Sequence, residues 1–142
     1  MLHYNIKTGL IIDALAAAQA QFPVLEQNKS GYNYEYLTLD NILNSLRPIL
    51  GKNGLALMQG HSIAVEDEQP FVVVSTTLFH KDEKIMSELR YPLGDAPKGM
   101  SEIQYVGSVI SYLRRYAVLG MLGVAGSEKE IEDIQTDEIK LK

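Results

Sequence analysis

The chain has 142 residues, of which 46% are hydrophobic, and a formal net charge of −5. This length suits a single domain with a substantial core, and the absence of cysteine excludes both a disulfide framework and a thiolate metal site. No apolar run approaches the roughly 20 residues that cross a bilayer, and the first residues lack a signal-peptide pattern. We therefore expect a soluble intracellular protein with no membrane partner.

The acidic residues are unevenly distributed. Residues 128–142 hold six acidic and three basic side chains, and residues 66–68 are all acidic. A negative net charge normally argues against a nucleic-acid binder, because phosphates are neutralised by a basic surface. Outside these two segments, however, enough basic residues remain for a local positive patch. We predict one domain over residues 1–127 and a flexible acidic tail over residues 128–142.

Two amphipathic helices are expected in the first half of the chain. Apolar residues recur at helical spacing over residues 7–22 and again over residues 38–52. Thr38 is a candidate cap for the second helix, and Pro48 predicts a kink or a break inside it. Between the two helices, the polar residues 28–31 predict a turn-forming loop.

Three tyrosines, Tyr32, Tyr34 and Tyr36, alternate just before the second helix. In an extended segment all three rings would lie on one side. Such a row can stack nucleobases, or it can anchor the segment by burying its rings in the core. The pattern leaves both interpretations open.

Three segments rich in β-branched residues follow, at residues 55–65, 71–80 and 85–92. The short polar connections between them are typical of hairpins. In the third segment Glu88 and Arg90 alternate with apolar residues, so they occupy a charged face. The sequence predicts a three-stranded antiparallel β-meander.

A long helix is predicted over residues 101–123. Ser101 and Gln104 have the spacing of a capping box, and Gly123 is a plausible stop. The order of helix, helix, three strands and helix predicts an α+β fold, in which the long C-terminal helix packs across the three-stranded meander and two helices precede it.

Residues three and four apart sort this long helix into three faces. The apolar face consists of Ile103, Val106, Ile110, Leu113 and Ala117. The aromatic face consists of Tyr105, Val109, Tyr112 and Tyr116. The polar face consists of Gln104, Ser108, Ser111 and Arg115, and Arg114 lies at the edge of this face. A buried guanidinium needs an anion or solvent. Adjacent residues point about 100° apart on a helix, so one arginine can bind a ligand while the other serves the fold or a neighbouring subunit. The pattern does not say which.

Evidence for catalysis is weak. His61, His80 and the pair Asp82 and Glu83 are the only residues that suggest metal or acid–base chemistry, and they lack a recognised ligand spacing. Phosphate-binding loops, dinucleotide fingerprints and nucleophile elbows do not occur. Tyr116 is not a good candidate nucleophile, because it shares the aromatic face with Tyr112 and is expected to be packed. We predict that the protein is not an enzyme and needs no cofactor.

Several motifs, in the same order, resemble the Erf (essential recombination function) family of phage single-strand DNA annealing proteins. The segments that carry the resemblance are Tyr34-Glu35-Tyr36-Leu37, Gly54-Leu55-Ala56-Leu57-Met58-Gln59, Leu78-Phe79-His80 and, most specifically, Gln104-Tyr105-Val106-Gly107-Ser108 with Tyr112-Leu113-Arg114-Arg115-Tyr116. The chain departs from the family pattern after His80, where Lys81 stands in place of an expected glycine.

The resemblance implies a β-β-β-α core and a homo-oligomeric ring or filament. It further implies that the protein binds single-stranded DNA and anneals complementary strands without ATP in the cytoplasm of a bacterium that carries a phage or prophage. A host single-strand-binding protein and a phage exonuclease are the further partners that it suggests.

A mechanism that fits the resemblance holds the DNA backbone with cations and leaves the base edges free. The residues assigned to DNA contact are Arg114 or Arg115, then Arg90 and Lys98, with hydrogen bonds from Gln104 and Ser108 and stacking on Tyr34 and Tyr36. Two other interpretations remain open, a scaffold oligomer that coats single strands without pairing them, and a nuclease or strand transferase.

Overall fold

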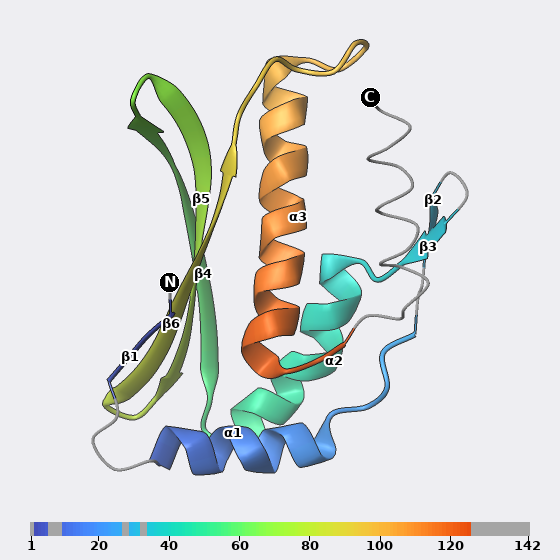
Figure 1. Cartoon of the computed structure of the whole chain (residues 1–142). Helices are drawn as coiled ribbons and strands as arrows, with labels where there is room; N and C mark the ends of the chain where they lie inside the picture. Colours follow the sequence, from blue (N-terminus) through green and yellow to red (C-terminus); the bar gives the residue numbers. More distant parts are fainter. Residues whose placement is uncertain (1, 6–9, 27–28, 32–33, 126–142) are drawn as a thin grey trace.

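The computed structural model describes residues 2–5, 10–26, 29–31 and 34–125, which form an α+β fold (Figure 1). The predicted order of two helices, three long strands and a long helix is confirmed. The elements are β1 (Leu2–Asn5), α1 (Leu10–Gln21), β2 (Lys29–Gly31), β3 (Tyr34–Tyr36), α2 (Leu39–Lys52), β4 (Ala56–Glu66), β5 (Gln69–His80), β6 (Glu83–Pro92) and α3 (Glu102–Leu122).

The main sheet has four antiparallel strands in the order β1-β6-β5-β4. Strands β4, β5 and β6 form the predicted meander, with Leu57 opposite Leu78 and Leu78 opposite Ile85. Strand β1 adds a fourth strand beside β6 that the sequence did not reveal. Four residues are too few for a periodic pattern, and the partner of β1 lies more than 75 residues away in the sequence.

Both hairpins of the meander turn through residues with positive φ. Asp67 and Glu68, between β4 and β5, have φ values of 49° and 66°, as the two central residues of a type I′ turn require. Lys81, between β5 and β6, has a φ of 53°. A lysine thus adopts a left-handed conformation at the position where a glycine was expected, and this costs free energy because its Cβ crowds the backbone.

Helix α3 begins and ends at the predicted residues. The Ser101 hydroxyl accepts from Gln104 N at 3.2 Å, and Gln104 Oε1 accepts from Ser101 N at 2.9 Å, which completes the capping box. At the other end Gly123 has a φ of 70°, and Val124 N donates to Leu119 O at 2.9 Å. The helix packs on β5 and β6, where Val109 and Ala117 meet Val72 and Val74.

A larger core lies at the C-terminal end of α3, where α1 and α2 also pack (Figure 1). Fully buried residues from each helix meet there, including Ile11, Ile42 and Leu122. The buried Glu83 carboxylate, at the start of β6, accepts from Ile11 N at 3.2 Å and so caps the first turn of α1. This core fixes the three helices relative to the sheet.

Two expectations about the first half are corrected. Residues 29–31 are not a loop but strand β2, which pairs with β3. Helix α2 runs without a break through Pro48, with Thr38 as its predicted cap. None of the helices in the described ranges is long and apolar enough to span a bilayer.

Candidate functional site

The polar face of α3 opens onto a groove of about 530 Å³ between α3 and the start of α2. This groove brings together several of the polar-face residues that were singled out in the sequence. It is lined by Thr38, Leu39, Asp40, Ser108, Ser111, Tyr112, Arg114 and Arg115.

Arg115 lies at the floor of the groove and is only 7% exposed. One of its terminal nitrogens donates to the carbonyl of Leu37 at 3.2 Å. Its guanidinium carbon also lies 4.9 Å from the ring centre of Tyr112 and 5.3 Å from that of Tyr116. These contacts tie α3 to the segment that leads into α2.

Arg114 has different surroundings. Its Nε donates to Gln59 Oε1 at 3.2 Å, while Gln59 Nε2 donates to the carbonyl of Arg114 at 3.1 Å and to the buried Thr76 hydroxyl at 2.9 Å. The two terminal nitrogens of Arg114 make no hydrogen bond or ion pair with any residue that the structure describes. Gln59 therefore orients the guanidinium and leaves its outer edge available to an anion.

Gln59 was not identified as a site residue from the sequence. It lies on β4, 55 residues before Arg114, and a single glutamine in a strand carries no signal of such a contact. The alternation of β4 places Gln59 on the helix side of the sheet, where its partner Thr76 also lies. Only the packing of α3 shows what it contacts.

The remaining neutral and basic candidates fall into different positions. Ser108 is half-buried in the groove. Gln104 is exposed, but its carbonyl oxygen is already used in the capping box. Lys98 is exposed in the connection between β6 and α3 and does not line the groove.

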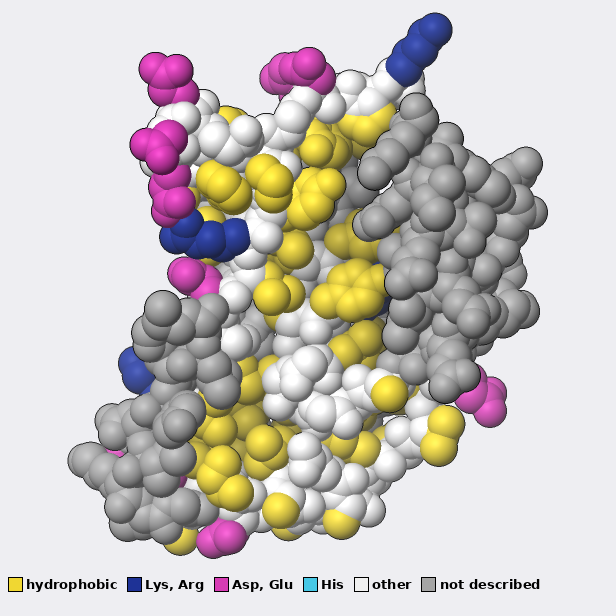
Figure 2. Space-filling view, in the orientation of Figure 1, with side chains coloured by type: hydrophobic (Ala, Val, Ile, Leu, Met, Phe, Trp, Pro, Cys, Tyr) yellow, Lys and Arg dark blue, Asp and Glu magenta, His cyan; other side chains and the backbone are white. Residues whose placement is uncertain are grey.

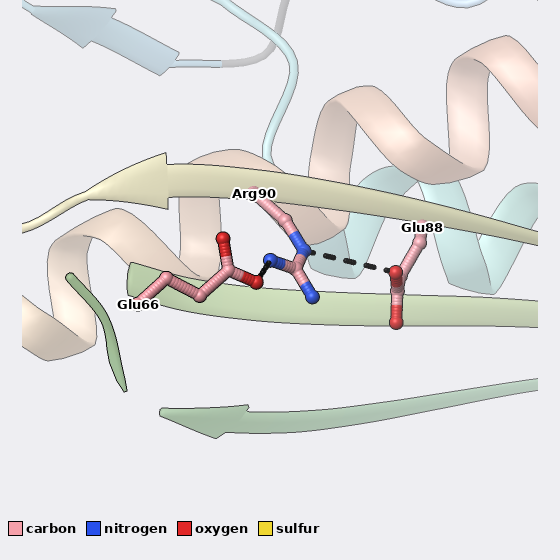
Figure 3. Close-up of polar contacts among 3 residues, drawn as sticks. All are labelled: Glu66, Glu88 and Arg90. Carbon is pink, nitrogen blue, oxygen red and sulfur yellow. Dashed lines mark hydrogen bonds and ion pairs between the residues drawn. The ribbon is translucent and has the colours of Figure 1, made fainter. Parts of the chain in front are cut away.

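Arg90 lies on β6, on the face of the sheet away from α3, because its neighbour Leu89 packs against the helix. It forms an ion pair with Glu66 and lies 3.8 Å from a carboxylate oxygen of Glu88 (Figure 3). The hydrogen bond to Glu66 and the charge of that carboxylate raise the pKa of Arg90, with a lesser contribution from Glu88, and desolvation opposes them. Its charge is therefore balanced locally, and the structure does not bring it to the groove.

The aromatic candidates lie on different elements. Tyr34 and Tyr36 belong to strand β3, but their side chains, like Tyr32 as a whole, lie outside the described residues. Tyr116, which was expected to be packed, is half-buried, whereas Tyr112 on the same helix face is 40% exposed and lines the groove. Its ring is stacked on that of Tyr116, with 6.3 Å between the centres and 23° between the planes.

The residues considered for catalysis do not converge. His80 Nδ1 lies 2.9 Å from the Gly54 carbonyl, Glu83 caps α1, and His61 is exposed on β4. Within the described ranges there is no group of three or more His, Cys, Asp or Glu side chains that could hold a metal ion.

Charge and apolar surface are distributed unequally around α3. Acidic side chains gather at the tip of the β4–β5 hairpin, and hydrophobic side chains lie between this hairpin and the N-terminal half of α3 (Figure 2). Exposed members of this apolar surface include Ile63, Val65 and Ile103. The acidic tip is unsuited to contact a phosphate backbone.

Comparisons with known proteins identify relatives. The model of a protein family described as "ERF superfamily" matches residues 11–139. The "Essential recombination function protein" of Salmonella phage P22 is 26% identical over 120 residues, which are 82% of this chain and 56% of the relative. The chain thus spans about half the length of this curated relative. No solved structure matches significantly.

Proposed function

Because the chain belongs to the ERF superfamily, we propose that it acts in phage recombination by binding single-stranded DNA and annealing complementary strands without ATP. The name of the P22 relative, a recombination function protein, supports the recombination part of this proposal. The observation that carries the DNA part is Arg114, whose guanidinium is oriented by Gln59 with its outer edge open.

The groove suits a sequence-independent contact with one strand. A guanidinium forms strong, directional hydrogen bonds with phosphate oxygens, and the hydroxyls of Ser108 and Ser111 lie on the same helix face. Contacts to phosphates position a strand without reading its sequence. Bases that are not read by hydrogen bonds keep their edges free to pair with a second strand.

Asp40 limits where a phosphate can lie. This residue lines the groove at the start of α2, and like charges repel each other most strongly where water is partly excluded. We therefore place the phosphate at the Arg114 side of the groove and away from α2.

A single arginine assigned to phosphate contact, Arg114, makes a weak site, and the net charge of the chain is −5. Repetition of the groove in a ring or filament would join many weak contacts along one strand, because each bound site raises the effective concentration of the next. Self-association is therefore part of the proposal. Residues 1–127 are proposed as the annealing domain, and the proposed acidic tail at 128–142 lies outside the described residues.

The test is the rate at which two fluorescently labelled complementary oligonucleotides pair, with and without the protein, in the absence of ATP and divalent metal. We expect acceleration at low salt that disappears as salt rises, because the contacts are electrostatic. Binding without acceleration would instead indicate a protein that only coats single strands. Cleavage on adding magnesium or manganese would indicate a nuclease and contradict the proposal.

A further inference from the structure

We propose that Tyr112 is a stacking site for one nucleobase of the strand whose phosphate contacts Arg114. This inference rests on the proposed function and assigns the base-binding part of the same groove. The sequence had suggested a different place for stacking, the row around Tyr34 and Tyr36.

Tyr112 and Arg114 flank the groove from opposite sides. They are two positions apart on α3, which places them about 200° apart around the helix axis, with the exposed Ser111 between them. A strand that lies across this face can therefore put a phosphate at one side and a base at the other. The groove volume of about 530 Å³ lies within the range of about 300–1,000 Å³ that is usual for small-molecule sites.

The ring of Tyr112 is held in place from behind. The Arg115 guanidinium carbon lies 4.9 Å from its centre, and the Tyr116 ring is stacked beside it at 6.3 Å. Arg115 is itself 7% exposed and bonded to the Leu37 carbonyl. A ring that is already fixed loses little conformational entropy when a base stacks on it.

Tyr112 combines an exposed side chain with a place in the lining of the groove. Tyr112 is 40% exposed although its neighbours on the same helix face, Val109 and Tyr116, are buried or half-buried. Every base has a π face, so stacking on such a ring tolerates any sequence. This property is what an annealing protein requires.

Exposure alone does not make a tyrosine a stacking site. Tyr91 is even more exposed, at 47%, but it lies on β6, outside the groove, and none of the ring contacts among the described residues involves it. Tyr91 is therefore the matched control for Tyr112.

The chain contains no tryptophan, so Tyr112→Trp introduces a single tryptophan, whose fluorescence can be excited selectively over that of the tyrosines. We expect oligothymidylate to quench the fluorescence of Tyr112→Trp, because a base stacks on the indole, and to leave that of Tyr91→Trp unchanged. Equal responses of the two variants would overturn the inference.

A second comparison, between oligothymidylate and an abasic strand, separates the contribution of the base to affinity from that of the phosphates. Tyr112→Ala should lower the affinity for oligothymidylate by about 5- to 150-fold but leave the affinity for an abasic strand of the same length unchanged, whereas Arg114→Ala should weaken both. Tyr112→Phe should bind like the wild type. If Tyr112→Ala does not fold, the tryptophan variant decides the question.

The two possible failures are distinguishable. If the wild type binds both strands at low salt and Tyr112→Ala weakens them equally, Tyr112 does not stack and the proposed function stands. If the wild type binds neither strand, the proposed function fails and the stacking site fails with it.

Discussion

The two halves of α3 differ in what surrounds them. The C-terminal half is enclosed by the sheet, α1 and α2, and its residues Val118 and Leu122 are fully buried. The N-terminal half packs against β5 and β6, and Ile103 there is 82% exposed. The groove lies where the two halves meet. One helix thus supplies a rigid core and an accessible surface, and the site uses both.

The two adjacent arginines also divide into one that contacts the core side of the groove and one whose outer edge is accessible. Arg115 turns toward α2 and binds a backbone carbonyl, whereas Arg114 turns toward β4 and is oriented by a neutral amide. A neutral partner fixes the guanidinium without cancelling its charge. This is the feature that favours Arg114 as the phosphate ligand.

The difference between the halves predicts that truncating an apolar side chain to alanine destabilises the protein much more in the C-terminal half than in the N-terminal half. Leu122→Ala should lower the free energy of unfolding by about 2–5 kcal/mol, because it leaves a cavity among fully buried side chains. Ile103→Ala should change it by less than about 0.5 kcal/mol. Urea unfolding of both variants measures this, and similar decreases would contradict the division.

Replacing each of the two arginines by alanine should distinguish the one that stabilises the fold from the one that is available for binding. Arg115→Ala should cost about 3 kcal/mol, since it removes the donor to Leu37 and the contacts with two tyrosine rings. Arg114→Ala should cost about 1 kcal/mol or less. Thermal unfolding with circular dichroism compares them, and the reverse order would show that Arg114 is the structural residue.

Gln59 offers a way to cancel the charge of Arg114 without removing it. Gln59→Glu keeps an acceptor for Arg114 Nε but adds a negative charge beside it, so single-strand affinity should fall about as much as in Arg114→Ala. Ser62→Glu adds the same charge on the opposite face of β4. Fluorescence anisotropy with a labelled oligonucleotide tests the pair. Equal effects of the two substitutions would mean that the position of the charge is unimportant.

The smallest effect on stability and binding together is expected in the β5–β6 turn, which belongs neither to α3 nor to the groove. Lys81→Gly should stabilise the protein by about 1 kcal/mol, because glycine accepts the positive φ without strain. Single-strand affinity should not change. Asp82→Gly, which relieves no positive φ, should instead destabilise, and stabilisation by both would point to a different cause.

The elements that local signals define could be predicted from the sequence. Ser101, Gln104 and Gly123 fixed the ends of α3 because capping depends on residues a few positions apart. Runs of β-branched residues and the short polar connections between them identified the three long strands. Local signals failed where the interacting residues are distant in the chain. The exposure of Ile103 depends on how far the sheet extends beneath α3, which periodicity does not reveal.

The site itself was predicted only in part. The sequence identified the polar face of α3 and the need of its arginines for partners. It could not assign their roles, because Leu37 lies 78 residues from Arg115 and Gln59 lies 55 residues from Arg114. Tyr112 was placed on the aromatic face with Tyr116 and was not singled out for DNA contact, because helical spacing does not show where a groove opens.

The most direct test of the central claim is the salt dependence of single-strand binding by the wild type, Arg114→Ala and Arg47→Ala. Arg47 is exposed on α2 and does not line the groove. The slope of log affinity against log salt should flatten by about 0.7 in Arg114→Ala, because one phosphate is no longer neutralised, and it should stay unchanged in Arg47→Ala. An unchanged slope in a folded Arg114→Ala protein would show that the groove on α3 is not where the backbone binds.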